Sequence, residues 1–176
     1  RRVLLEQSLL PTDNSESFKT PGFCCVCGES TNFLTSFMYS TGPTPDGRPM
    51  PNWREHMQCQ HCGLVNRMRA ALNALHTSAH PNATSRIYIT ERLTQTYNWL
   101  DRRYATLQGS EYFGPEHKPG SIVEGIRHED VMNLSFKDNS FDFVLSFDVL
   151  EHVPFPDKAF KEIYRALDEN GFFIFS

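Results

Sequence analysis

Residues 141–176 read FDFVLSFDVLEHVPFPDKAFKEIYRALDENGFFIFS, and this stretch decides the fold class. The apolar run at 141–147 predicts a buried strand, and apolar residues at helical spacing after Asp157 predict an amphipathic helix. Gly171 is expected to end that helix, and the aromatic run at 172–176 predicts another strand. A strand, a helix and a second strand in this order predict parallel pairing in an α/β sheet.

The same alternation extends upstream of residue 141. Strands are predicted at 86–90, 107–113 and 121–130, and a helix is predicted to begin near Leu93. The segment 114–120, GPEHKPG, predicts a tight loop. Together with the two later strands, these elements predict a doubly wound parallel sheet whose first five strands lie in this chain.

Five cysteines occupy a separate, earlier part of the chain. Four of them form two Cys-x-x-Cys pairs, each followed by a glycine that lets the turn close around an ion. The predicted ligands are Cys24, Cys27, Cys59 and Cys62. Four thiolates on two tight turns suit tetrahedral Zn²⁺, so we predict a closed structural zinc site in a zinc-ribbon-like module. A redox dithiol is the alternative.

The other residues of this module that carry possible ligands are given different roles. Cys25 breaks the spacing and is expected to be a buried or free thiol, and the sequence does not assign it a role. His56 and His61 are expected at the surface or around the cluster, because four cysteines already complete the shell. Short strands are expected at 31–40 and 53–58, on either side of a loop rich in Pro and Gly.

These patterns divide the chain into three parts. A lead-in segment is predicted at residues 1–20. The zinc-ribbon-like module, with a helix from Leu64, is predicted at residues 21–80, and the sheet domain is predicted at residues 81–176. No apolar run approaches the roughly 20 residues that span a bilayer, so no membrane span is expected. The paired cysteines and the absence of an export signal favour a reducing, cytoplasmic location.

Charge weighs against a nucleic-acid partner. The chain has 17 basic and 21 acidic residues, a net charge of −4, whereas nucleic-acid binding needs clustered basic residues. The arginines of the two predicted helices are few and are expected to lie on solvated faces. Nucleic acid is therefore an unlikely partner.

Acidic residues follow the predicted strands. They are Glu91, Glu111, Asp130 and Asp148. Open parallel sheets bind their ligands at the carboxyl ends of the strands, so these side chains are expected to converge on one ligand. Any one of them can equally be a helix cap or a solvated residue, but four at equivalent positions favour a site.

From Glu129 onward the sequence resembles the second half of class I S-adenosylmethionine-dependent methyltransferases. The matching motifs are Asp130, LSF at 134–136, FDFV at 141–144, LEHV at 150–153, RAL at 165–167 and Gly171. The resemblance implies a Rossmann-like sheet, here partial, with S-adenosylmethionine as cofactor. It says little about the methyl acceptor.

Carried to this chain, the resemblance implies a role for each matching position. Glu111 is expected to hold the ribose of the cofactor. Asp130, with the backbone N–H of Val131, is expected to bind the adenine. Ser146 and Asp148 are expected to line the pocket beside the sulfonium.

His152 and the first turn stand apart from that pattern. His152 is a weak candidate for a general base, with a structural role as the alternative. Thr90 and Glu91 take the place of the glycine-rich turn that the family carries after its first strand, and no glycine is present there. This departure predicts a variant branch of the family and leaves cofactor binding at this turn an open question.

The same resemblance implies two further strands beyond residue 176. A C-terminally truncated fragment is therefore expected, inactive by itself, with an incomplete acceptor side and an exposed strand edge. The expected function of the parent protein is methyl transfer to a small molecule or a glycan precursor. The alternatives are a non-catalytic scaffold with a zinc-stabilised module that binds a partner, and an RNA-modifying methyltransferase.

Overall fold

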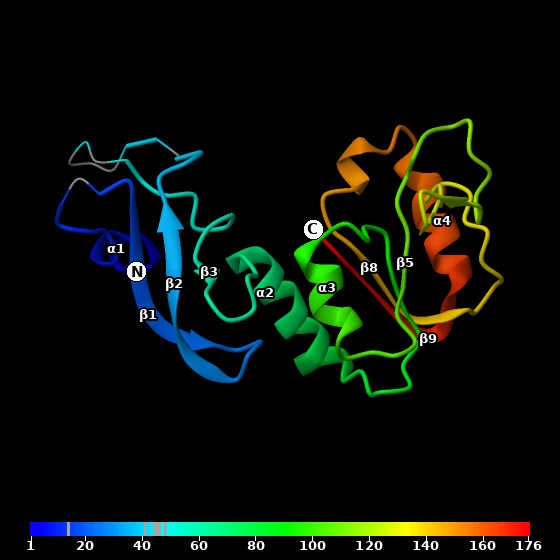
Figure 1. Ribbon diagram of the computed structural model, residues 1–176, viewed down its shortest axis with the longest axis horizontal. Helices are drawn as coiled ribbons and strands as arrows, with labels where there is room; N and C mark the ends of the chain where they lie inside the picture. Colours follow the sequence, from blue (N-terminus) through cyan, green and yellow to red (C-terminus); the bar gives the residue numbers. More distant parts are fainter. Residues whose placement is uncertain (14, 41, 44–46, 48) are drawn as a thin grey trace. The chain divides into compact units, whose positions relative to one another are not determined.

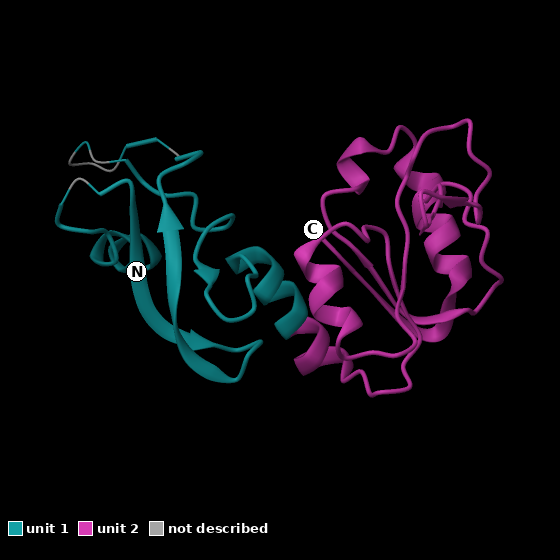
Figure 2. Cartoon of the chain, in the orientation of Figure 1, with its two compact units in different colours: residues 1–73 teal, residues 74–176 magenta. Residues whose placement is uncertain are grey.

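A computed structural model describes residues 1–13, 15–40, 42–43, 47 and 49–176. The chain forms two compact units, residues 1–73 and 74–176, shown in teal and magenta in Figure 2. The predicted domain limits at 20/21 and 80/81 stay predictions. The loop predicted between the two cysteine pairs lies partly outside the described residues.

Unit 1 is built on a small antiparallel sheet of order β1-β2-β3. Its elements are α1 (Arg2–Ser8), β1 (Ser17–Cys24), β2 (Glu29–Ser36), β3 (Gln58–Cys59) and α2 (Asn66–Ala74), labelled in Figure 1. Alternate residues of β2, namely Thr31, Phe33 and Thr35, are buried, as a strand with one covered face requires. The strand predicted at 31–40 is thus confirmed as far as Ser36.

The predicted lead-in segment contains the helix α1 and the start of β1. One expectation for unit 1 is wrong. Of the strand predicted at 53–58, residues 53–55 form a turn and only Gln58 lies in a strand. The turn forms because the backbone N–H groups of Glu55 and His56 both donate to the carbonyl of Asn52 at 3.0 Å.

Unit 2 contains the predicted parallel sheet, in the order β5-β4-β8-β9. Its elements are η1 (Leu75–Ala79, a π-helical turn), β4 (Ile87–Ile89), α3 (Gln95–Asp101), β5 (Gln108–Gly109), β6 (Ile122–Val123), β7 (Ile126–Arg127), β8 (Phe141–Ser146), η2 (Leu150–His152), α4 (Pro156–Ala166) and β9 (Leu167–Phe175). Helices α3 and α4 lie on opposite sides of the sheet (Figure 1). The parallel α/β sheet is confirmed.

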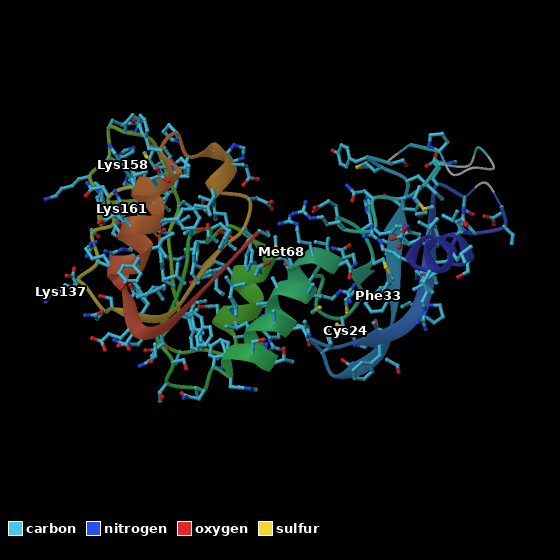
Figure 3. All side chains as sticks on the ribbon, turned by 180° about the vertical axis from the view of Figure 1, so that it is seen from behind. Cys24, Phe33, Met68, Lys137, Lys158 and Lys161 are labelled. Carbon is cyan, nitrogen blue, oxygen red and sulfur yellow. The ribbon has the colours of Figure 1, made fainter. Side chains whose placement is uncertain are left out.

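The core of unit 2 lies between the sheet and α4. Tyr88 stacks on Phe141 with ring centroids 5.3 Å apart, and Ile163 and Ala166 of α4 are buried in the same cluster. The other face of α4 is exposed, and Lys158 and Lys161 extend from it away from the sheet (Figure 3). β8 is buried along nearly its whole length, as expected for a strand covered on both faces.

Gly171 has a different role from the one predicted. Helix α4 ends at Ala166, and Gly171 lies inside β9. A Cβ at this position would lie 2.9 Å from the carbonyl oxygen of Asp168 and 3.2 Å from that of Asp142. Glycine is required there because two backbone segments approach closely, and the helix ends without it.

The third strand of the predicted sheet is replaced by a hairpin. β6 and β7 pair antiparallel around Glu124 and Gly125, whose φ angles are +50° and +80°. Two left-handed residues in a row are typical of the tight turn that joins antiparallel strands. The third strand survives as a single parallel bridge between Glu111 and His128.

Across the part of the chain that the structure describes, no helix combines the length and the apolar character needed to traverse a bilayer.

Candidate functional site

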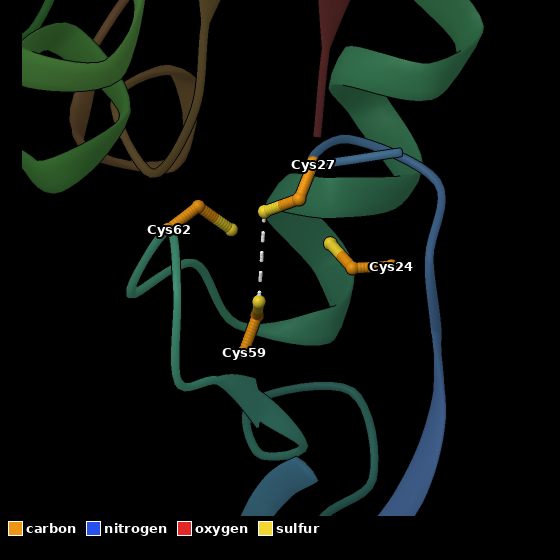
Figure 4. Close-up of side chains that lie close together, drawn as sticks. All are labelled: Cys24, Cys27, Cys59 and Cys62. Carbon is orange, nitrogen blue, oxygen red and sulfur yellow. Dashed lines mark hydrogen bonds between the residues drawn. The ribbon is translucent and has the colours of Figure 1, made fainter. Parts of the chain in front are cut away.

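The four predicted cysteine ligands lie together in unit 1. Their sulfur atoms are all within 4.8 Å of one another (Figure 4). The two turns that carry them are alike, since Gly28 N–H donates to Cys24 O at 2.8 Å and Gly63 N–H donates to Cys59 O at 2.9 Å. Both glycines have a positive φ near +75°, which explains the glycine after each pair.

The cluster fits a tetrahedral metal ion. Cys27 Sγ lies 3.7 Å from Cys59 Sγ, and four thiolates about 2.3 Å from a zinc ion would lie about 3.8 Å apart. Burial raises the pKa of the Cys27 and Cys62 thiols. It acts on the pKa of Cys59 in the same direction, but hydrogen bonds from the backbone N–H groups of Cys62 and His61 bring that pKa down to about 6. The thiolate, which is the form that binds metal, is thereby favoured at this position.

The neighbouring candidate ligands lie outside the cluster. Cys25 is exposed. His61 Nδ1 is 2.8 Å from Glu29 Oε1, and His56 Nε2 is 2.8 Å from the carbonyl oxygen of Met38.

A second candidate site is a pocket of ≈ 270 Å³ in unit 2. It lies at the carboxyl ends of the strands, because Thr90 directly follows β4, Glu111 comes two residues after β5, and Asp148 comes two residues after β8. Asp130, Val131 and His152 also line it. Eight residues were predicted from the sheet pattern and the family resemblance together, and six of them line this one pocket.

The pocket wall is acidic. Its carboxyl groups belong to Glu111, Glu129, Asp130 and Asp148, and the described lining residues include neither Lys nor Arg. The Glu129 side chain is fully buried and accepts hydrogen bonds from Arg127 Nε at 2.7 Å and from the hydroxyl of Ser135 at 2.5 Å. The wall therefore favours a ligand with positive charge.

Glu111 and Asp130 each accept a hydrogen bond from a backbone N–H group. Glu111 Oε1 accepts from Leu93 N–H at 2.6 Å, and Asp130 Oδ1 accepts from Met132 N–H at 2.8 Å. Each carboxylate keeps acceptor capacity on its other oxygen. Both side chains are thus fixed in orientation while still able to bind a ligand.

The two remaining predicted residues lie behind the pocket wall. Glu91 and Ser146 are buried and do not line the pocket. Glu91 Oε1 accepts from Phe147 N–H at 2.9 Å, the hydroxyl of Thr90 donates to the Glu91 carboxyl group, and Ser146 Oγ lies 3.0 Å from Thr90 Oγ1. Burial, followed by the charges of Asp148 and Glu111, raises the pKa of Glu91 to about 8.

Several lining residues were not predicted. They include Tyr112, Glu129, Met132 and Val149. Each is a chain neighbour of a predicted acidic residue or lies two positions from one, and this adjacency is the signal that could have found them. Tyr112 is exposed, and its ring lies 5.5 Å from that of the buried His128.

Residues 92–175 match a protein-family model described as a methyltransferase domain. This segment is therefore similar to methyltransferase domains. The match begins directly after Glu91. The turn after β4, which lacks glycine, therefore lies at the N-terminal limit of the matched segment.

The proteins similar to this chain include the following three. Phosphoethanolamine N-methyltransferase 2 of Caenorhabditis elegans is 45% identical over 42 residues, which are 24% of this chain and 10% of the nematode protein. A Methanococcus maripaludis structure, provisionally described as an S-adenosyl-L-methionine-dependent methyltransferase, has 17% identity and a TM-score of 0.47 over 61% of this chain and 53% of its own. The YcgJ protein of Bacillus subtilis has 19% identity and a TM-score of 0.47 over 60% and 49%. The chain thus spans about half of these structures and a tenth of the nematode relative.

Proposed function

We propose that unit 2 binds S-adenosylmethionine and serves in the transfer of its methyl group to a small molecule or a glycan precursor. One observation carries this proposal: Glu111, Asp130 and Asp148, from three different segments, line one pocket at the carboxyl end of a parallel sheet. In the reaction the methyl–sulfur bond breaks, a bond to the acceptor atom forms, and S-adenosylhomocysteine leaves. A proton leaves the acceptor if it carries one.

The lining residues would divide the cofactor between them. Glu111 would accept hydrogen bonds from the ribose hydroxyls through its second carboxylate oxygen. Asp130 would accept from the adenine amine, and Val131 N–H would donate to the ring. Thr90 and Asp148 would lie near the sulfonium, where a negative wall offsets its charge.

His152 is the side chain placed to act on the acceptor. It lies on η2, is exposed, and lines the pocket. An imidazole there can take up the proton that a hydroxyl or amine loses on methylation. Alignment of acceptor and methyl group also promotes the transfer by itself, so the base contributes only where the acceptor carries a proton.

The acidic wall favours a small acceptor over nucleic acid. A chain of phosphates would meet the carboxyl groups of Glu111, Asp130 and Asp148, and the described lining residues include neither Lys nor Arg. The name of the nematode relative also gives a small-molecule acceptor.

We propose that the cysteine cluster holds one structural Zn²⁺. The four sulfur atoms, all within 4.8 Å of one another, would complete a tetrahedral shell around the ion and leave no position open for catalysis. The ion would stabilise a unit too small for a large core of its own. Reduced, metal-bound cysteines fit the cytoplasm.

A non-catalytic scaffold is the second candidate. The turn after β4 favours it, because side chains stand where the family has bare glycine backbone and Glu111 already accepts from Leu93 N–H. In that case the pocket would be a remnant and the zinc module would bind a partner.

Calorimetry distinguishes the two functions. We expect the chain to bind S-adenosylmethionine and S-adenosylhomocysteine, and we expect Glu111→Gln and Asp130→Asn to weaken both by about 10- to 100-fold, the effect of one charged hydrogen bond. Glu169→Gln is the matched control, because Glu169 is exposed on β9 and does not line this pocket. Absence of binding by the wild type would favour the scaffold.

A further inference from the structure

The turn after β4, residues 90–94, is anchored on both sides. Toward β8, Thr90 N–H donates to Leu145 O at 3.1 Å. Toward β5, Arg92 N–H donates to Ser110 O at 3.0 Å, and Leu93 N–H donates to the Glu111 carboxylate. A turn held at both edges does not need the conformational freedom of glycine.

Glu91 makes the central anchor of this turn. Its carboxyl group accepts from Phe147 N–H in the segment that leaves β8 and from the hydroxyl of Thr90 in its own turn. Glu91 and Phe147 are 8% and 2% exposed, so water does not compete for these bonds. The Thr90 hydroxyl extends the link to Ser146 at 3.0 Å.

We propose that Glu91 is a positioning residue for the cofactor: its carboxyl group ties the turn after β4 to the end of β8 and holds Thr90 and Asp148 on one pocket wall. This inference rests on the proposed function. It assigns to a buried carboxyl group the task that bare backbone performs in a glycine-rich turn. Glu91 acts through its neighbours and does not itself line the pocket.

The groups around Glu91 are acidic or neutral. Asp148 faces it from the segment after β8, Glu111 from the segment after β5, and the phenol of Tyr88 from β4. Burial and the two carboxylates raise the pKa of Glu91 to about 8, so it is mostly protonated at neutral pH. A sulfonium in the pocket would favour the ionised form, and binding would then release a proton.

The main test uses Glu91→Gln, which keeps an oxygen for Phe147 N–H and cannot ionise. Affinity for S-adenosylmethionine is measured by calorimetry from pH 6.5 to 8.5 in the wild type and the variant. We expect the ratio of wild-type to variant affinity to rise with pH, about 10-fold for each unit by which the ligand lowers the pKa of Glu91. Titration of the ligand's own amino group affects both proteins equally and cancels in the ratio. Glu169→Gln should follow the wild type.

Glu91→Ala tests the anchor itself. We expect its affinity for S-adenosylmethionine and S-adenosylhomocysteine to fall at least about 10-fold at every pH, because the Phe147 N–H loses its buried acceptor. If this variant does not fold, the pH profile of Glu91→Gln alone tests the role of Glu91. Wild-type binding that both variants reproduce at all pH values overturns this inference alone, whereas a wild type that binds neither ligand overturns the proposed function and this inference with it.

Discussion

The backbone N–H of Phe147 donates a hydrogen bond to Glu91 Oε1 at 2.9 Å, between residues 56 positions apart in the chain. Both residues are buried. The bond joins the segments that leave β4 and β8, two neighbouring parallel strands. A carboxyl group in this place stabilises the sheet end best when it is protonated, because burial disfavours its charge.

Stability of unit 2 should therefore fall as pH rises. The pKa of Glu91 is about 8 in the folded chain and near 4.5 when exposed, so the contribution of Glu91 is fully present below pH 4.5 and is lost as pH rises to about 8. We expect the free energy of unfolding of the wild type to decrease relative to Glu91→Gln by about 1.4 kcal/mol per pH unit across this window. Urea unfolding followed by the fluorescence of buried Trp99, in a Trp53→Phe background, measures it in unit 2.

Glu169→Gln provides the matched control for this experiment. It also replaces one carboxyl group by an amide, but on an exposed residue, and its stability should follow the wild type at every pH. Parallel pH profiles for the wild type and Glu91→Gln would show that Glu91 is ionised in the folded chain.

Apolar runs predicted the sheet well, and local turn chemistry explains where they did not. The runs at 86–90 and 141–147 became β4 and β8 because central strands of a parallel sheet are buried on both faces. The segment 121–130 also contains apolar residues, but Glu124 and Gly125 adopt left-handed conformations and fold it into a hairpin. Two residues in the middle of the segment thus outweighed its hydrophobic pattern.

The candidate sites were predictable to different degrees. The cysteine ligands could be predicted from their spacing. The two cysteines of each pair are three positions apart on one tight turn, so they must lie close together in space. The strand-end pocket follows from the parallel sheet, which brings Glu111, Asp130 and Asp148 to one edge. The inward orientation of Glu91 does not follow, because it depends on a hydrogen bond from Phe147, which lies 56 residues further along the chain in the segment that leaves β8.

Arg165 joins α4 to the segment that precedes β8. Its guanidinium donates to the carbonyl oxygens of Leu134 and Phe136 at 3.0 and 2.7 Å and to the carboxylate of Glu162. We expect Arg165→Met to lower the free energy of unfolding by about 2 kcal/mol at neutral pH, since charged hydrogen bonds are lost in a partly buried site. Urea unfolding measures the change.

The pH dependence of this change distinguishes the ion pair from packing. The hydrogen bond from Arg165 lowers the pKa of Glu162, so that part of the stability is present above the ordinary pKa of glutamate and is lost as pH falls through the lowered one. The difference between Arg165→Met and the wild type should therefore shrink in acid. Lys161→Met, on the exposed face of α4, should change stability by less than about 0.5 kcal/mol.

Gly109 lies under the ring of Tyr97. A Cβ on Gly109 would come 2.4 Å from Tyr97 Cε2 and 3.3 Å from Arg92 Cβ. We expect Gly109→Ala to destabilise unit 2 by about 1–3 kcal/mol through overpacking. In the double variant Gly109→Ala/Tyr97→Leu much of that loss should be recovered, and a double-mutant cycle by urea unfolding measures the coupling. Strict additivity of the two changes would contradict this contact.

The cysteine cluster should hold about one zinc ion per chain, and the metal should stabilise unit 1. Cys59→Ser removes a buried ligand and should abolish zinc binding, as measured by elemental analysis.

The fluorescence of Trp53, measured in a Trp99→Phe background, reports on the folding of unit 1, because Trp53 packs against Phe18 with ring centroids 6.0 Å apart. In Cys59→Ser or after treatment with a strong chelator, this signal should lose its cooperative thermal transition, because structural zinc contributes about 10 kcal/mol or more to small domains of this kind. Cys25→Ser is the matched control, since it removes a neighbouring exposed thiol and should retain both metal and transition. Zinc retained at full stoichiometry in Cys59→Ser would show that the ion is bound elsewhere.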